Sequence, residues 1–163
     1  MTAPSTIPFV IRGLGSGVAQ TISTEGRIAH RFRTDAYPAF GGEDAAPSPL
    51  FYALASLSSC NQVTASLVAH DLGIQLGAWR FEVRGELDPQ VLVNGAVGNA
   101  NFTRVVVKAI VETDASEAQF ARLIAETERR CPVSQLFKRS GLDFENQWSR
   151  TPLPIALATA TAN

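Results

Sequence analysis

The chain of 163 residues is long enough to form one domain with a substantial hydrophobic core. Its net charge of -1 at pH 7 and its 18% of charged residues provide no basic surface for nucleic acid or for an anionic membrane. The N-terminus lacks the regions of a secretory signal, and no apolar run approaches the length of a membrane span. We therefore expect a cytoplasmic protein with no nucleic-acid or membrane partner, whose thiols stay reduced.

The N-terminal region has the composition of short strands. Residues 5–35 carry brief runs of Val, Ile, Thr and Phe, broken by the glycine-containing segments RGLGSG and TEG. This pattern predicts two or three short strands with tight turns. The next segment, GGEDAAPSP, is a loop by composition, and its end predicts a helix with Ser48 as N-cap and Pro49 at the first helical position.

The helix predicted from Pro49 has an unusual composition. It contains no charged residue as far as His70, and Gly73 is placed to end it. A surface helix normally carries a charged face. We therefore expect this helix to be long, central and buried, wrapped by other structure or by a second subunit.

The second half of the chain predicts a sheet with helices. Residues 79–87 and 101–112 alternate apolar and polar side chains, as half-buried antiparallel strands do. The connection between them is predicted to be a long loop. An amphipathic helix follows, with Asp114 and Glu117 as its capping box, and residues 142–148 predict a last strand.

This order of elements predicts an α+β fold, an antiparallel sheet with helices on one face. The pattern of elements ends at residue 148, and the following sequence is small, proline-punctuated and uncharged. We therefore expect a single domain over residues 1–148 and a C-terminal tail over residues 149–163.

Cys131 lies after two arginines and before a proline, in the segment ERRCPVSQLF. Pro132 ends one helix and is suited to begin the next, so Cys131 is the predicted N-cap of a short helix. A thiolate there faces unpaired backbone N–H groups, with Arg129 and Arg130 beside it, and both effects lower a thiol pKa. The alternative is that Cys131 is a small buried side chain that fits the bend.

Cys60 lies in the uncharged helix, where its neighbours on the helical wheel are mostly apolar. Burial there raises a thiol pKa and leaves the thiol inert unless a cation reaches it from elsewhere. From these neighbours alone, a packing role is the better interpretation. A metal site is not expected, because two Cys and two His without close spacing make a poor ligand set.

Five segments occur here in a combination that is specific. They are DxxPxxGGxD at 35–44, PSP at 47–49, LASLSSC ending at residue 60, GELD at 85–88 and RCPV at 130–133. Together they resemble the OsmC/Ohr family of osmotically inducible and organic-hydroperoxide-resistance proteins, over roughly residues 25–148.

The resemblance implies an α+β subunit whose central helix is enclosed in an intertwined homodimer. It also implies a thiol-dependent peroxidase without a cofactor. In that chemistry Cys60 attacks the O–O bond of an organic hydroperoxide and becomes a sulfenic acid. Cys131 then resolves the sulfenic acid by forming a disulfide with Cys60, and a dithiol reductant reduces the disulfide. A sulfenic acid beside a second thiol does condense in this way before it over-oxidises. The local sequence favours Cys131 as the thiolate, whereas the family assigns the attack to Cys60.

Leu50 departs from the family pattern. In the peroxidases a glutamate follows the helix-starting proline and, with an arginine from the N-terminal strands, orients the reactive thiolate. Arg27 is the predicted arginine here, and Arg31 is the second choice. Two alternatives to a peroxidase stay open: a dimer that binds a small hydrophobic ligand near Cys60 with little or no turnover, and a dimer whose thiols only pack.

Overall fold

The computed structural model describes residues 6–154. The chain divides into two compact units, Met1–Ala53 and Leu54–Asn163. The single domain expected over residues 1–148 stays a prediction. Within the described range, no helix is both long and apolar enough to cross a membrane.

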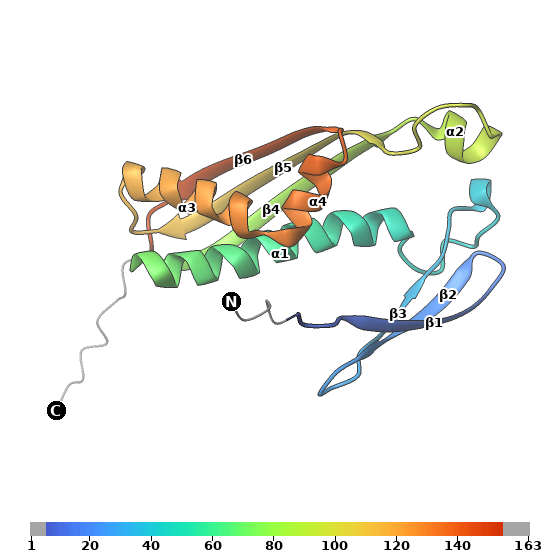
Figure 1. Ribbon diagram of the computed structural model, residues 1–163, viewed down its shortest axis with the longest axis horizontal. Helices are drawn as coiled ribbons and strands as arrows, with labels where there is room; N and C mark the ends of the chain where they lie inside the picture. The colour runs from blue at the N-terminus through green and yellow to red at the C-terminus, as the bar shows by residue number, and fades with distance from the viewer. Residues whose placement is uncertain (1–5, 155–163) are drawn as a thin grey trace. The chain divides into compact units, whose positions relative to one another are not determined.

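The first unit contains an antiparallel sheet with the strand order β1-β2-β3, drawn in blue in Figure 1. Its strands are β1 (Val10–Ser16), β2 (Ala19–Glu25) and β3 (Arg31–Thr34), and a short 3-10 helix, η1 (Pro38–Phe40), follows. Ser16 pairs with Ala19, so β1 and β2 are joined by a two-residue turn. Gly17 has a φ of 60° in that turn, which favours glycine. The short strands predicted for this region are confirmed.

The loop after β3 is organised by the carboxylate of Asp35. Oδ1 accepts the N–H of Ala36 at 2.8 Å, and Oδ2 accepts the N–H groups of Glu43 at 3.1 Å and Ala45 at 3.0 Å. A Cβ on Gly42 would lie 2.0 Å from the carbonyl oxygen of Ala36, so the loop can close only around a glycine. The DxxPxxGGxD motif therefore has a structural role here.

Helix α1 (Pro49–Leu72) has the ends that the sequence predicts. The carbonyl of Ser48 accepts the N–H groups of Phe51 and Tyr52, and Gly73 ends the helix with a φ of 66°. The residues buried on α1 recur at helical spacing: Leu57, Asn61, Thr64, Ala65, Val68 and Ala69. The chain thus buries one face of α1, and other apolar side chains of the helix stay exposed.

The second unit is built on the sheet β4-β5-β6, with β4 (Leu76–Leu87), β5 (Phe102–Thr113) and β6 (Asp143–Thr151). Strands β4 and β5 are antiparallel, as predicted, but β6 is parallel to β5. The expectation of a wholly antiparallel sheet is therefore corrected, while the α+β class is confirmed. The parallel pairing is possible because the connection from β5 to β6 contains two helices, which return the chain across the sheet.

Helices α3 (Glu117–Arg130) and α4 (Pro132–Arg139) form that connection. The capping box of α3 is made by Ser116 and Gln119, which corrects the predicted pair Asp114 and Glu117. The carboxylate of Asp114 is engaged elsewhere, since it accepts the N–H of Gln75 at 3.0 Å. A tertiary contact has thus displaced a local one.

The connection between β4 and β5 also differs from prediction, because it contains a short helix, α2 (Pro89–Asn94). Asp88 caps this helix by accepting the N–H of Gln90 at 2.9 Å. Strand β6 continues to Thr151, so the predicted tail does not begin at residue 149. Residues 155–163 of that tail lie outside the described residues.

Helices α1, α3 and α4 lie on the same face of the second sheet, as Figure 1 shows. One cluster joins α1, β5 and α3; its buried residues are Ala65, Val68, Ala69, Ile74, Val111, Ala115, Phe120 and Leu123. A second cluster joins Leu57 of α1 to Val105 and Val107 of β5, and Val133 and Phe137 of α4 pack against it. Together these contacts hold α1 against the junction of α3 and α4.

Candidate active site

The two thiols that the sequence singles out meet inside the second unit. Cys60 lies on α1 and is half-buried, whereas Cys131 lies between α3 and α4 and is fully buried. Both are free, and each thiol is among the groups that shift the pKa of the other. Residues far apart in the chain have therefore been brought close together.

Cys131 is the N-cap of α4, as predicted. Its backbone is extended, with φ -75° and ψ 112°, and Pro132 occupies the first helical turn. The N–H of Ser134 donates to Sγ at 3.4 Å, while the N–H of Cys131 itself donates to the carbonyl of Thr127 at 2.9 Å. The backbone of Cys131 thus ends α3, and its sulfur caps α4. These two hydrogen bonds fix the position of the sulfur.

Hydrogen bonds favour the thiolate form of Cys131. Burial alone would raise its pKa, but the O–H and N–H of Ser134, together with the side chains of Cys60 and Thr64, outweigh burial and hold the pKa below its ordinary value. The direction agrees with the sequence analysis.

The predicted contribution of the neighbouring arginines to that shift is corrected. Arg129 pairs with Glu126 at 2.7 Å, and Arg130 pairs with Asp71 at 2.6 Å. Neither arginine is among the main causes of the Cys131 pKa shift within the described residues. The hydroxyl group and the backbone N–H of Ser134, in the first turn of α4, lower the pKa of Cys131 instead.

Cys60 has the opposite electrostatics. Burial raises its pKa, and the hydrogen bond to Cys131 and the negative charge of that neighbour raise it further. The N–H of Val133 and the side chain of Thr64 offset part of this rise. The pKa of Cys60 is thus raised and that of Cys131 lowered, and the two thiols titrate as a coupled pair.

Two polar side chains that sequence reasoning missed complete this site. Asn61 and Ser134 are both fully buried, and Asn61 Nδ2 donates to Ser134 Oγ at 3.2 Å. The same nitrogen donates to the carbonyl of Leu57 at 2.9 Å. The signal was available in the sequence: an amide directly follows Cys60, and a hydroxyl occupies the third helical position after Cys131.

The predicted arginine belongs to the first unit, whereas the two thiols belong to the second. Arg27 is exposed in the bend between β2 and β3, within the first unit, and its predicted role stays a prediction. Leu50 lies in the first turn of α1 and is 37% exposed, so the position at which the family has its glutamate is apolar. The carboxylate that would orient an arginine is therefore missing at that position.

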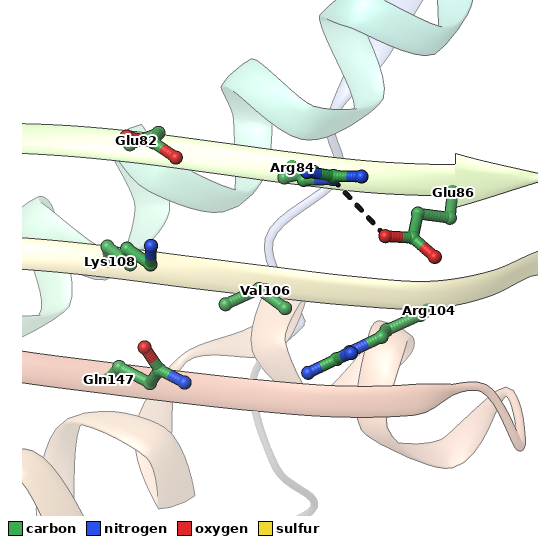
Figure 2. A pocket seen from close by; sticks show the side chains of 7 residues that line it. All are labelled: Glu82, Arg84, Glu86, Arg104, Val106, Lys108 and Gln147. Carbon is green, nitrogen blue, oxygen red and sulfur yellow. Dashed lines mark ion pairs between the residues drawn. The ribbon is translucent and has the colours of Figure 1, made fainter.

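A hollow on the second sheet is unrelated to the thiols. Figure 2 shows its lining on the three strands: Glu82, Arg84, Glu86, Arg104, Val106, Lys108 and Gln147. Arg84 and Glu86 form an ion pair at 3.2 Å. The alternating residues Phe81 and Val83 pack in the core with α1, so the hollow faces away from the helices. Charges of both signs line it, as on an ordinary solvated sheet face.

The fold and the two neighbouring thiols define an α+β protein with a dithiol site between α1 and the start of α4. The chain belongs to the OsmC-like family, because the family model described as OsmC-like protein matches residues 41–145. No curated protein matches the sequence.

Solved structures of OsmC and organic hydroperoxide resistance proteins share the fold. The OsmC-like protein from Mycoplasma pneumoniae is 18% identical, with a TM-score of 0.75 over 90% of this chain and 99% of that chain. An organic hydroperoxide resistance protein OsmC from Legionella pneumophila is 19% identical, with a TM-score of 0.68 over 90% and 99%. An organic hydroperoxide resistance protein from Elizabethkingia anophelis is 17% identical, with a TM-score of 0.69 over 91% and 100%. At these identities the similarity establishes the fold.

Proposed function

We propose that this protein is a thiol peroxidase that reduces organic hydroperoxides in oxidative-stress defence. The observation that carries the proposal is the proximity of the side chains of Cys60 and Cys131, each of which shifts the pKa of the other. A packing role would require no second thiol at that point. A sulfenic acid formed on one sulfur here would have the other thiol within immediate reach.

In the proposed reaction the thiolate of Cys60 attacks the terminal peroxide oxygen. The O–O bond breaks, a sulfenic acid forms, and the alkoxide takes up a proton to leave as an alcohol. The thiolate of Cys131 then attacks the sulfur of Cys60, which forms the disulfide and releases hydroxide, protonated to water. The two thiols supply two electrons, and a dithiol reductant returns them.

The relatives support the substrate class. The proteins from Legionella pneumophila and Elizabethkingia anophelis are organic hydroperoxide resistance proteins by name. The pair of cysteines in this chain provides the groups that such chemistry needs. Because the cytoplasm keeps thiols reduced, it is the location that we expect for this cycle.

We also propose that the protein acts as a homodimer. Val63 and Leu67 lie four residues apart on α1 and are 61% and 57% exposed. Two large apolar side chains on one face of an uncharged helix indicate a surface that a partner covers. Light scattering tests this: the wild type should be a dimer, and Val63→Asp combined with Leu67→Asp should be a monomer. The matched control is Val97→Asp, since Val97 is fully exposed in a loop and should not affect association.

Single cysteine variants test the peroxidase proposal. Cys60→Ser should abolish the consumption of an organic hydroperoxide such as cumene hydroperoxide. Cys131→Ser should consume one equivalent per chain and then stop, because the sulfenic acid has no thiol to resolve it and over-oxidises. Mass spectrometry of the product distinguishes the sulfinic and sulfonic acids from a disulfide.

Unchanged peroxide consumption in Cys60→Ser would exclude Cys60 as the attacking thiol. Repeated turnover by Cys131→Ser at the wild-type rate would exclude an intramolecular disulfide. If the wild-type protein consumes no peroxide and both thiols survive, the site is not a peroxidase, and the alternative function of binding a small hydrophobic ligand takes its place.

A further inference from the structure

We propose that Cys60 and Cys131 together bind a monosubstituted trivalent arsenical, an arsenic atom that carries one organic group and whose two remaining valences the two sulfurs fill. This ligand lies outside peroxide reduction. The proposal requires two reduced thiols that lie close together. It does not depend on the proposed peroxidase function, nor on which of the two sulfurs carries a charge.

Hydrogen bonds between α1 and α4 hold the two thiols in one place. Asn61, the residue directly after Cys60, donates from Nδ2 to Ser134 Oγ at 3.2 Å. The backbone N–H of Ser134 donates to the sulfur of Cys131 at 3.4 Å. Ser134 therefore contacts both the chain neighbour of Cys60 and the sulfur of Cys131. Because Asn61 and Ser134 are fully buried, these contacts lie within packed structure.

The packing of the core supports the same placement. Leu57, which precedes Cys60 on α1, is fully buried, and Val133 of α4 packs against its cluster. Each thiol also shifts the pKa of the other. Folding has thus already positioned both sulfurs, so a ligand that takes both of them needs little further ordering of the chain.

The number of sulfurs limits the kind of ligand. The chain has two cysteines, and within residues 6–154 no group of three or more Cys, His, Asp or Glu side chains could hold a metal ion. A structural zinc ion takes four such ligands. Thiolates prefer soft centres, and trivalent arsenic is one. Two thiolates complete the valence of an arsenic atom with one organic group, whereas inorganic arsenite has room for a third sulfur.

The bonding step exchanges two As–O bonds for two As–S bonds. Cys60 is half-buried and Cys131 is fully buried, so the first As–S bond forms at Cys60 and the second at Cys131. At each step the thiol proton goes to a hydroxyl group of the arsenical, which leaves as water. The oxidation states of sulfur and arsenic do not change, and the step therefore needs neither an oxidant nor a reductant.

Phenylarsine oxide, which water hydrates to the dihydroxy form, is the probe for the first test. One equivalent added to the fully reduced, full-length protein should remove both thiols from a free-thiol count. Native mass spectrometry should show one phenylarsenic group on each chain, and the competing dithiol 2,3-dimercaptopropanol should release it and restore both thiols. Loss of one thiol, or of none, would overturn the proposal.

Variants test whether the pair is required. Cys131→Ser and Cys60→Ser keep one thiol each and should bind the probe about 10²- to 10⁴-fold more weakly, because the second bond is no longer intramolecular. The matched control adds Val97→Cys to each of them, since Val97 is fully exposed in a loop. These chains again have two thiols, but not as neighbours, and should bind as weakly as the single variants.

Circular dichroism shows whether each variant is folded, and Cys60→Ser with its control carries the test if Cys131→Ser does not fold. Wild-type affinity in the controls would overturn the proposal, because any two thiols would then be sufficient. Competition with inorganic arsenite tests the number of sulfurs. The protein should retain phenylarsine oxide at equal concentrations of the two, and a preference for arsenite would reveal a third ligand and contradict the two-sulfur site.

A parallel thiol count with cumene hydroperoxide separates this proposal from the proposed function. If phenylarsine oxide takes both thiols while the hydroperoxide leaves both intact, the arsenical site stands and the peroxidase proposal fails. If the hydroperoxide removes both thiols and phenylarsine oxide does not bind, the arsenical site fails and the peroxidase proposal stands.

Discussion

Replacing Asn61 with leucine should leave the stability of the protein nearly unchanged. Leucine has almost the same shape as asparagine, so Asn61→Leu fills the same buried space. The substitution removes two donated hydrogen bonds, to the carbonyl of Leu57 and to Ser134 Oγ. It also removes Oδ1, an acceptor that has no hydrogen-bond partner in the described part of the chain.

These effects nearly cancel. Two neutral hydrogen bonds contribute about 1 kcal/mol each, or about 2 kcal/mol together. An unsatisfied buried acceptor costs about 1–3 kcal/mol, and that cost disappears in the variant. The free energy of unfolding of Asn61→Leu should therefore lie within about 1 kcal/mol of the wild type. Asn61→Ala loses the same bonds and also leaves a cavity, so it should be the less stable of the two variants.

Urea unfolding of the reduced proteins, followed by circular dichroism, measures these differences. Thr127→Val is the reference, since it removes a buried hydroxyl that has no hydrogen-bond partner among residues 6–154, and it should be neutral or stabilising. The reasoning is refuted if Asn61→Leu loses more than about 3 kcal/mol while Thr127→Val is neutral, because the two hydrogen bonds of the amide would then outweigh the cost of its unsatisfied oxygen.

Three further predictions test the surrounding structure. Leu57→Ala should lower the free energy of unfolding by about 2–5 kcal/mol in urea titrations, because Leu57 is fully buried against β5, and a loss below about 1 kcal/mol would contradict its place in the core. Asp35→Asn should destabilise the protein at neutral pH: backbone hydrogen bonds from Ala45, Ala36 and Glu43 hold the pKa of Asp35 below its ordinary value, so its contribution is present above the unfolded-state pKa and is lost as the pH falls through the folded-state pKa. Urea titrations of wild type and variant should therefore converge in acid, and a difference that persists there would show that the charge is not the cause. Leu50→Glu should raise the rate of peroxide consumption if Arg27 has its predicted role, whereas the uncharged Leu50→Gln should not, and equal rates in the two variants would reject that role.

Much of the fold could be predicted because its signals are local. Pro49 and Gly73 mark the ends of α1, and Pro132 identifies Cys131 as an N-cap; all three expectations are confirmed. The parallel direction of β6 could not be predicted, since alternation along a strand carries no information about the direction of its neighbour. The capping box was misplaced because two overlapping patterns compete, and the contact of Asp114 with Gln75 decides between them.

The site was only partly accessible from the sequence. The lowered pKa of Cys131 was anticipated, and the backbone N–H groups at the start of α4 were correctly given as one cause. The other cause was assigned to Arg129 and Arg130, whose acidic partners cannot be identified from sequence neighbours. The pairing of the two thiols came from the family resemblance, since nothing in their spacing brings them together. Asn61 and Ser134 matter only once α1 lies against the start of α4, and that contact depends on the whole core.

The most direct test of the central claim is a count of free thiols in fully reduced protein, before and after one equivalent of an organic hydroperoxide. The account predicts that Cys60 and Cys131 disappear together, two thiols for each peroxide, and that a dithiol reductant restores both. Survival of both thiols would contradict it, and the proximity of Cys60 and Cys131 would then have no peroxidase function.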